Sequence, residues 1–169
     1  RRLGFHVAGH VPYTASAQEA LDSGQKSFEH MARVWGTGTT GEPGPKGEPP
    51  GLGFFGPCWR IDSIGDRQCA ALAARFRQQN SYFTPTLAPW MDASDTTGES
   101  LFSQQTRTDF WLLTRLVRFG VPLLAGSDNV IGMSGLEPEE VFAGTRGVHR
   151  ELWLLVAAGL TPLEALRTA

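Results

Sequence analysis

The sequence lacks most of the features that would set it apart from an ordinary folded domain. Only two of its 169 residues are cysteine, and no CxxC pair occurs. No apolar run approaches the ~18 residues that a membrane-spanning helix needs. The formal net charge is −2, so no excess of basic residues is available to attract nucleic acid. We therefore expect no disulfide framework and neither nucleic acid nor a membrane as a partner.

The cysteines and the first residues favour the cytoplasm as the default compartment. Cys58 and Cys69 are expected to be ordinary thiols, because no CxxC or paired His suggests a metal site around them. The opening stretch, RRLGFHVAGH, has no initiator Met and no signal-peptide plan of charged, apolar and small-residue regions. It begins inside an expected strand, and the closing TPLEALRTA is a helix that has barely started. We therefore expect a fragment of a longer protein.

Gly and Pro dominate residues 36–60. Glycine recurs at every third position only three times before proline breaks the register, which excludes a collagen-like triple helix. This composition also excludes a helix interior or a central strand, and predicts a long exposed loop inserted before a helix. Trp35, Phe54, Phe55 and Trp59 lie in or beside the loop. They either anchor a protein partner or pin the loop to the fold, and the loop itself is either a lid or padding.

Short apolar segments alternate with helical patterns on both sides of this loop. The expected strands cover residues 3–11, 26–30, 82–87 and 121–128. The expected helices cover residues 16–24, 63–80, 106–120, 149–159 and 161–169. Thr161 followed by Glu164 is a capping box, which marks the start of the last helix. Such alternation predicts parallel βαβ units and therefore an α/β fold.

Three polar side chains fall at the ends of expected strands. His10 lies near the end of the first, His30 ends the second and Asp128 ends the fourth. Because the carboxyl ends of parallel strands gather at one edge, we expect these side chains to converge. Two imidazoles and a carboxylate suit a divalent ion such as zinc. The carboxylate then either binds the ion or accepts a proton from its bound water.

Each of these residues also has a purely structural interpretation. A single His in a strand is commonly a buried, hydrogen-bonded core residue, which is the interpretation we prefer for His6. Asp128 lies in AGSDN, where turn-forming residues cluster. His6 and His10 would stand about 13 Å apart on a strand at ~3.3 Å per residue, so one ion could not bind both. Serine hydrolysis has little support, because no GxSxG motif surrounds Ser127.

Four motifs, in this order along the chain, resemble the metal-dependent amidohydrolase superfamily, and most closely its imidazolonepropionase-like and prolidase-like branch. The motifs are GHVPYTASAQEALDSGQKSFEH, TPTL, LLAGSDN and HRELWLLVAAGLTPLEALRTA. The resemblance covers nearly the whole chain apart from the Gly/Pro loop. It implies a partial (β/α)8 TIM barrel, approximately strands 5–8 with their helices. Residues 1–169 would then form the C-terminal part of one barrel domain, with 36–60 as an insertion.

The resemblance also implies a reaction and a set of site residues. His10 and His30 would be metal ligands, and Asp128 would be both a metal ligand and the catalytic proton acceptor. His149 matches a recurrent family position and is implied as a substrate-binding residue. The implied cofactor is one or two divalent ions, most simply zinc. The implied activity is hydrolysis of a C–N amide, cyclic amide or dipeptide-like bond in a small-molecule substrate.

Two family features are missing from this sequence. The His-x-His of the family's first strand is absent, and so is the Lys or Glu that bridges two metals in many members. We therefore expect the isolated chain to lack part of the metal site and to be inactive. The alternative is a non-catalytic α/β domain that binds a partner through the Gly/Pro loop. Neither the substrate nor the oligomeric state is indicated by the sequence.

Overall fold

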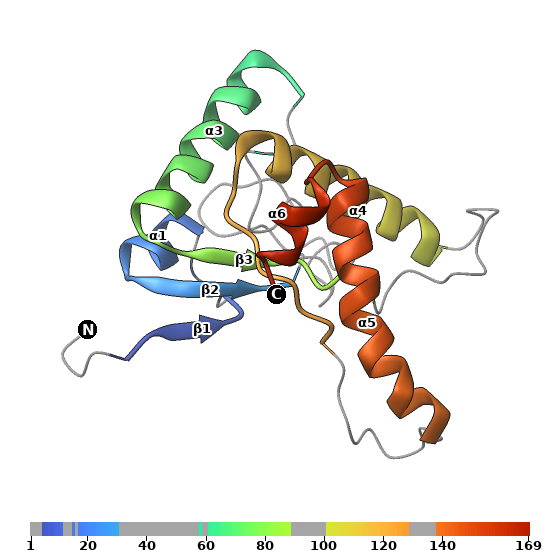
Figure 1. Ribbon diagram of the computed structural model, residues 1–169. Helices are drawn as coiled ribbons and strands as arrows, with labels where there is room; N and C mark the ends of the chain where they lie inside the picture. The colour runs from blue at the N-terminus through green and yellow to red at the C-terminus, as the bar shows by residue number, and fades with distance from the viewer. Residues whose placement is uncertain are drawn as a thin grey trace.

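The computed structural model describes residues 5–11, 15, 17–30, 58, 61–88, 101–128 and 138–169. The strands in these ranges are β1 (Val7–Gly9), β2 (Gln25–Glu29) and β3 (Tyr82–Thr84). The helices are α1 (Ala17–Asp22), α3 (Ser63–Gln78), α4 (Leu101–Phe119), α5 (Pro138–Ala157) and α6 (Pro162–Leu166). Their order along the chain alternates as the sequence predicts (Figure 1).

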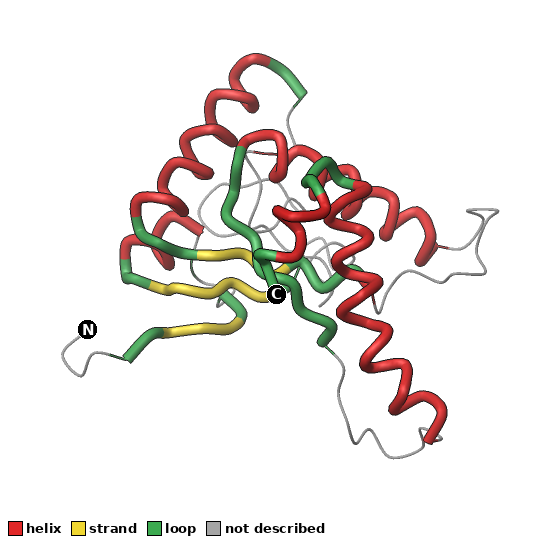
Figure 2. Tube along the Cα trace, in the orientation of Figure 1, coloured by secondary structure: helices red, strands yellow, loops and turns green. Residues whose placement is uncertain are grey.

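The three strands form one parallel sheet in the order β1-β2-β3, so neighbours in the sheet are also consecutive strands of the chain. Residues 121–128 continue this series on the far side of β3 (Figure 2). Phe83 forms a parallel bridge with Leu123, and its backbone N–H donates to the Pro122 carbonyl at 2.9 Å. The predicted α/β class with parallel strands is therefore confirmed.

The interior lies between the sheet and its helices. On α3, the buried side chains recur at helical spacing and face the sheet. There the Phe76 ring meets the Phe28 ring of β2 edge to face, with centroids 5.0 Å apart. Leu116 of α4 and Leu155 of α5 are also fully buried. Burying a side chain of this size contributes about 1.5–3 kcal/mol, so these contacts hold the helices onto the sheet.

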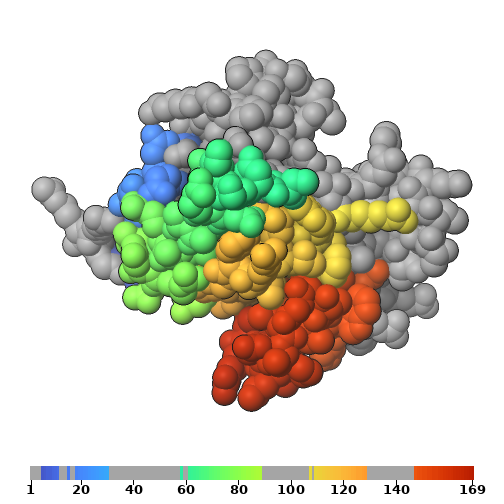
Figure 3. Space-filling view, turned by 90° about the horizontal axis from the view of Figure 1, so that it is seen from above, coloured from blue at the N-terminus to red at the C-terminus, as the bar shows by residue number. Residues whose placement is uncertain are grey.

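Side-chain caps define the starts of two helices. Asp62 caps α3, and its carboxylate accepts a hydrogen bond from the Gly65 N–H at 2.7 Å. The predicted capping box of α6 is present, since Thr161 and Glu164 bond each other's backbone N–H groups. The C-terminal helices lie beside residues 121–128 (Figure 3). There the Ala125 N–H donates to the Thr168 carbonyl at 2.8 Å.

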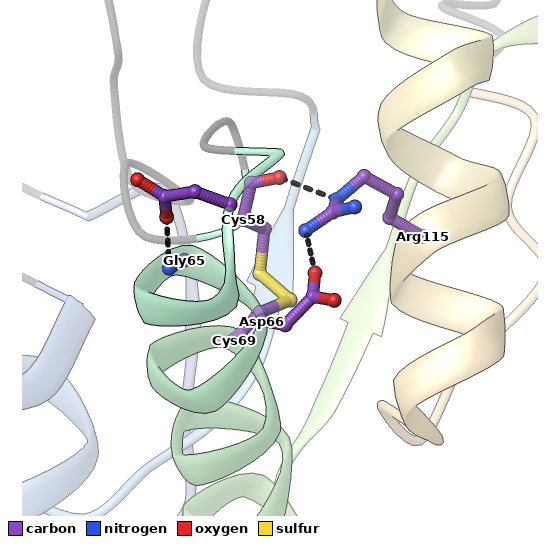
Figure 4. A network of polar contacts seen from close by, with 6 residues as sticks. Cys58, Gly65, Asp66, Cys69 and Arg115 are labelled. Atoms are coloured by element: carbon purple, nitrogen blue, oxygen red, sulfur yellow. Dashed lines mark hydrogen bonds and ion pairs between the residues drawn. A yellow bond between two sulfur atoms is a disulfide. The ribbon is translucent and has the colours of Figure 1, made fainter.

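The expectation of two free thiols is wrong, because Cys58 and Cys69 form a disulfide. Both are fully buried, and the bond joins the end of the Gly/Pro segment to α3 (Figure 4). Arg115 of α4, which is also buried, links α4 to the residues around the disulfide. Its Nε donates to the Cys58 carbonyl at 2.8 Å and its Nη2 to Asp66 at 2.7 Å. The sequence did not indicate this disulfide, because the bond depends on how α3 places Cys69 beside Cys58.

Several predicted boundaries also move. The predicted strands 3–11 and 121–128 shorten to β1 and to the single bridge at Leu123. Helices α4 and α5 begin at Leu101 and Pro138, earlier than predicted. Helix α5 extends through Gly144 and Gly147 although each is about 1 kcal/mol less favourable than Ala in a helix.

The loop prediction for 36–60 falls outside the described residues, apart from Cys58. The aromatic residues singled out there, Trp35, Phe54, Phe55 and Trp59, lie outside them too. Across the helices that the structure does describe, none is both long and apolar enough to cross a membrane.

Candidate metal centre

Each predicted metal ligand lies at the carboxyl edge of the parallel sheet. His10 follows β1, His30 follows β2, and Asp128 ends the segment beside β3. The His10 and His30 ring centroids are 4.7 Å apart, with the ring planes at 30°. On the other side of His30, its Nε2 lies 3.8 Å from Asp128 Oδ2. His30 therefore stands at the centre of two close pairs.

The backbone at this edge adopts an uncommon conformation. His30, Thr86 and Asp128 have φ angles of 65°, 50° and 45°. Asn80, with φ 48°, is the one other non-glycine residue with positive φ in the described ranges. Left-handed backbone at such positions costs of order 1 kcal/mol each and clusters at functional sites. Thr86 is the least expected of the three, because its branched Cβ disfavours this region.

Sequence reasoning missed Thr86, which lies in the TPTL motif just past β3. Its side chain is buried, and its Oγ1 hydrogen bonds His30 Nδ1. The same hydroxyl lies 2.8 Å from the Pro85 carbonyl, which can only accept, and we assign the single hydroxyl hydrogen to that bond. On this assignment, His30 Nδ1 carries the proton in its hydrogen bond to Thr86. The neutral ring then presents a bare Nε2 toward Asp128, the tautomer that a metal-binding His requires.

The surroundings of His30 favour the neutral form of its ring. Burial lowers the pKa of His30 below the ordinary value of 6.5, and the neighbouring His10 lowers it further. Asp128 and Glu29 act in the opposite sense, because a carboxylate stabilises an imidazolium, but the net shift is downward. The neutral ring, which can donate an electron pair to a metal, is therefore favoured relative to a free imidazole.

The His10–His30 and His30–Asp128 pairs do not form a compact cluster of ligands. Among the residues that the structure describes, no group of three or more His, Cys, Asp and Glu side chains could hold a metal ion as it stands. His30 is held in place, with a side chain only 11% exposed, whereas the Asp128 side chain is 38% exposed. His10 is exposed as well. The two outer members therefore have the rotamer freedom to turn toward a shared ion.

Gly126 lets the last segment approach the end of β3. A Cβ at this position would lie 2.5 Å from Thr84 Cγ2 and 3.3 Å from Thr86 Cγ2. The first distance is shorter than side-chain contacts allow, so any larger residue here would force Thr84 or the backbone to move. The close approach brings Asp128 to the same edge as His30.

Two other histidines are not part of the pairs formed by His10, His30 and Asp128 in the described residues. His6 is exposed, so its predicted role as a core residue is wrong. His149 lies inside α5 and is exposed, two residues before the buried Glu151. The sequence did contain a signal for Glu151. It shares a helix face with Leu154 and Leu155, where an apolar residue is expected.

The fold and this edge define a class, namely an α/β protein with a His-His-Asp group at the carboxyl end of a parallel sheet. Compared with known proteins, the chain matches no family model, no curated protein and no solved structure.

Proposed function

We propose that this chain carries part of the metal centre of an amidohydrolase-type hydrolase, which cleaves a C–N amide, cyclic amide or dipeptide-like bond in a small molecule. The proposal includes a finer fold, in which the sheet is an arc of a (β/α)8 barrel covering approximately strands 5–8. The chain-order, all-parallel arrangement of β1, β2, β3 and the Leu123 bridge supports that fold.

One observation carries the proposal. Nε2 of His30 and the carboxylate of Asp128 face each other at 3.8 Å, and Nε2 carries no proton in the tautomer assigned from the Thr86 contact. A lone pair and an anionic oxygen repel at this distance unless a cation lies between them. A proton on His30 Nε2 would remove this repulsion, but burial opposes protonation by lowering the pKa of the ring. A divalent ion satisfies both partners, and His10 is close enough to His30 to be the next ligand.

This donor set fits zinc. Catalytic zinc sites use three protein ligands, commonly two His and one carboxylate, and leave a further position open. When bound, zinc lowers the pKa of a water molecule and polarises a carbonyl oxygen. Of the chain's own residues, His30 is the fixed ligand and His10 the adjustable one. Asp128 accepts a proton from the attacking water and returns it to the leaving nitrogen.

The proposal assigns the remaining ligands to residues outside these 169, because the sequence contains neither a His-x-His pair nor the bridging Lys or Glu. Zinc binding is therefore expected of this chain, whereas efficient hydrolysis is expected only of the complete enzyme.

Zinc binding can be measured by dialysis of the purified chain followed by metal analysis. We expect one zinc per chain, abolished by His10→Ala combined with His30→Ala. His6→Ala is the matched control, since His6 is exposed and outside the group, and it should bind zinc as wild type does. A wild-type chain that binds no zinc would contradict the proposal, as would an equal loss in the His6 variant.

The role of Asp128 is tested in the complete enzyme. Asp128→Asn keeps the size of the side chain but cannot accept a proton. Turnover should fall by about 10²–10⁴, the usual contribution of a general base. Turnover within a few fold of wild type would show that Asp128 is not the proton acceptor.

A further inference from the structure

Helix α5 carries a carboxyl group where its pattern calls for an apolar side chain. Glu151 is 0% exposed and lies among the fully buried Leu154 and Leu155. Its Oε2 accepts a hydrogen bond of 2.8 Å from the backbone N–H of Ala88. Within the described part of the chain, its Oε1 has no hydrogen-bond partner.

A half-satisfied buried acid is costly, so its presence calls for a reason. Helix packing alone gives none, because Leu or Met would fill the position at lower cost. Burial raises the pKa of Glu151, and the backbone N–H groups of Ala88, Leu87 and Thr86 act in the opposite sense. The carboxyl group is therefore directed at the backbone of residues 86–88.

The same backbone segment contacts His30. It begins at Thr86, which is buried and has a φ of 50°. Nothing in the side chain of Thr86 favours this conformation, so the surrounding structure must impose it. The Thr86 hydroxyl is the hydrogen-bond partner of His30 Nδ1. A continuous series of contacts thus runs from α5, through the 86–88 backbone, to the central histidine of the candidate metal centre.

We propose that Glu151 is a positioning residue for His30. By holding the Ala88 N–H from inside α5, it keeps Thr86 in its left-handed conformation, and the Thr86 hydroxyl in turn fixes the His30 ring. The ring then keeps its proton on Nδ1 and its bare Nε2 toward Asp128. This role rests on the proposed function, in which Nε2 is the metal-binding atom.

The test compares Glu151→Met, which removes the acceptor, with Glu151→Gln, which keeps one carbonyl oxygen. Glu164→Gln is the matched control, because Glu164 is exposed and belongs to the capping box of α6. Amide hydrogen exchange reports on Ala88, and long-range ¹H–¹⁵N NMR of the imidazole rings reports the His30 tautomer. Zinc affinity is measured on the same samples.

In the Met variant, we expect the Ala88 amide to exchange about tenfold faster, the equivalent of one lost hydrogen bond. The His30 ring should show mixed tautomers, and zinc should bind about 10–100-fold more weakly, as for other lost supporting contacts. The Gln variant and the control should resemble wild type. A folded Met variant with unchanged exchange and an unchanged His30 tautomer would overturn the proposal, as would a Gln variant as disturbed as the Met variant.

If the Met variant does not fold, amide hydrogen exchange in the wild-type chain still tests the proposal. The Ala88 amide should then exchange as slowly as the Leu154 amide inside α5, and fast exchange at Ala88 would overturn the proposal. The zinc measurement separates the two claims. A wild-type chain without zinc whose His30 tautomer still responds to Glu151→Met contradicts the proposed function alone. Zinc binding with an unresponsive His30 contradicts the positioning role alone.

Discussion

At the carboxyl edge of the sheet, polar side chains stand on strained backbone, whereas the interior behind it joins apolar side chains on regular helices and strands. His30, Thr86 and Asp128 all have positive φ. Phe28 and Phe76, both almost fully buried, meet edge to face between β2 and α3. The interior therefore supplies folding free energy that the edge reduces, a division expected where an arrangement is kept for chemistry.

Buried polar groups show the same contrast. Arg115 in the interior bonds both the Cys58 carbonyl and the Asp66 carboxylate. His30 is bonded on its Nδ1 side, while its Nε2 faces Asp128 at 3.8 Å, beyond hydrogen-bond distance. The proposed metal ion would complete the pairing of His30 on its Nε2 side.

The largest effect on stability should come from the interior. Phe76→Ala removes a fully buried ring and leaves a cavity, and should lower the free energy of unfolding by about 3–5 kcal/mol. Urea denaturation of the chain measures this loss. Phe5→Ala is the matched control, because Phe5 is 78% exposed, and it should change stability by less than about 0.5 kcal/mol. Equal losses in the two variants would contradict the assignment of the core.

The disulfide should have the next largest effect. Cys69→Ser opens the bond to Cys58 and should cost about 2–4 kcal/mol, because the unfolded chain loses a cross-link. Treating the wild-type chain with a thiol reductant should lower its stability in the same direction, while the Cys69→Ser chain should not respond. Free-thiol titration of the unfolded wild-type chain provides a direct check, and two reactive thiols would mean that the bond does not form.

At the strained edge, removing a whole side chain should favour stability, whereas in the interior it lowers stability. Asp128→Gly removes both the carboxylate and the left-handed penalty of a side chain, whereas Asp128→Ala removes only the carboxylate. The Gly variant should therefore be about 1 kcal/mol more stable than the Ala variant. Both should lose zinc binding to a similar extent. An Ala variant as stable as the Gly variant would indicate that the backbone at 128 is relaxed.

The smallest effect concerns pH. The pKa of Glu151 is raised above 4.5 in the folded state, so folding favours the protonated group. Its contribution to stability is fully present below pH 4.5 and is lost as pH rises through the folded-state pKa. Wild type should therefore lose stability relative to Glu151→Gln over this rise. The pKa of exposed Glu164 is lowered, so the comparison with Glu164→Gln should have the opposite sign. Parallel pH profiles for both variants would show that Glu151 is not buried as described.

Much of the fold could be predicted because its signals are local. Alternating apolar segments predicted the parallel strands, and the Thr161 capping box predicted the start of α6. The disulfide could not be predicted, because it depends on how α3 returns Cys69 to Cys58. The same limit applies to the site. Strand-end position pointed to His30 and Asp128, and the apolar face of α5 marks Glu151 as unusual. The partners of Thr86 and Glu151, however, depend on tertiary contacts that their sequence neighbours do not reveal.

The most direct test of the central claim is ¹⁵N NMR of the labelled chain, titrated with zinc, which distinguishes the two nitrogens of each imidazole. We predict that zinc binds Nε2 of His30 while Nδ1 keeps its proton, with the His10 ring shifting in the same titration and the His6 ring unchanged. Binding through Nδ1 of His30, or no change in the His30 ring at saturating zinc, would contradict the account.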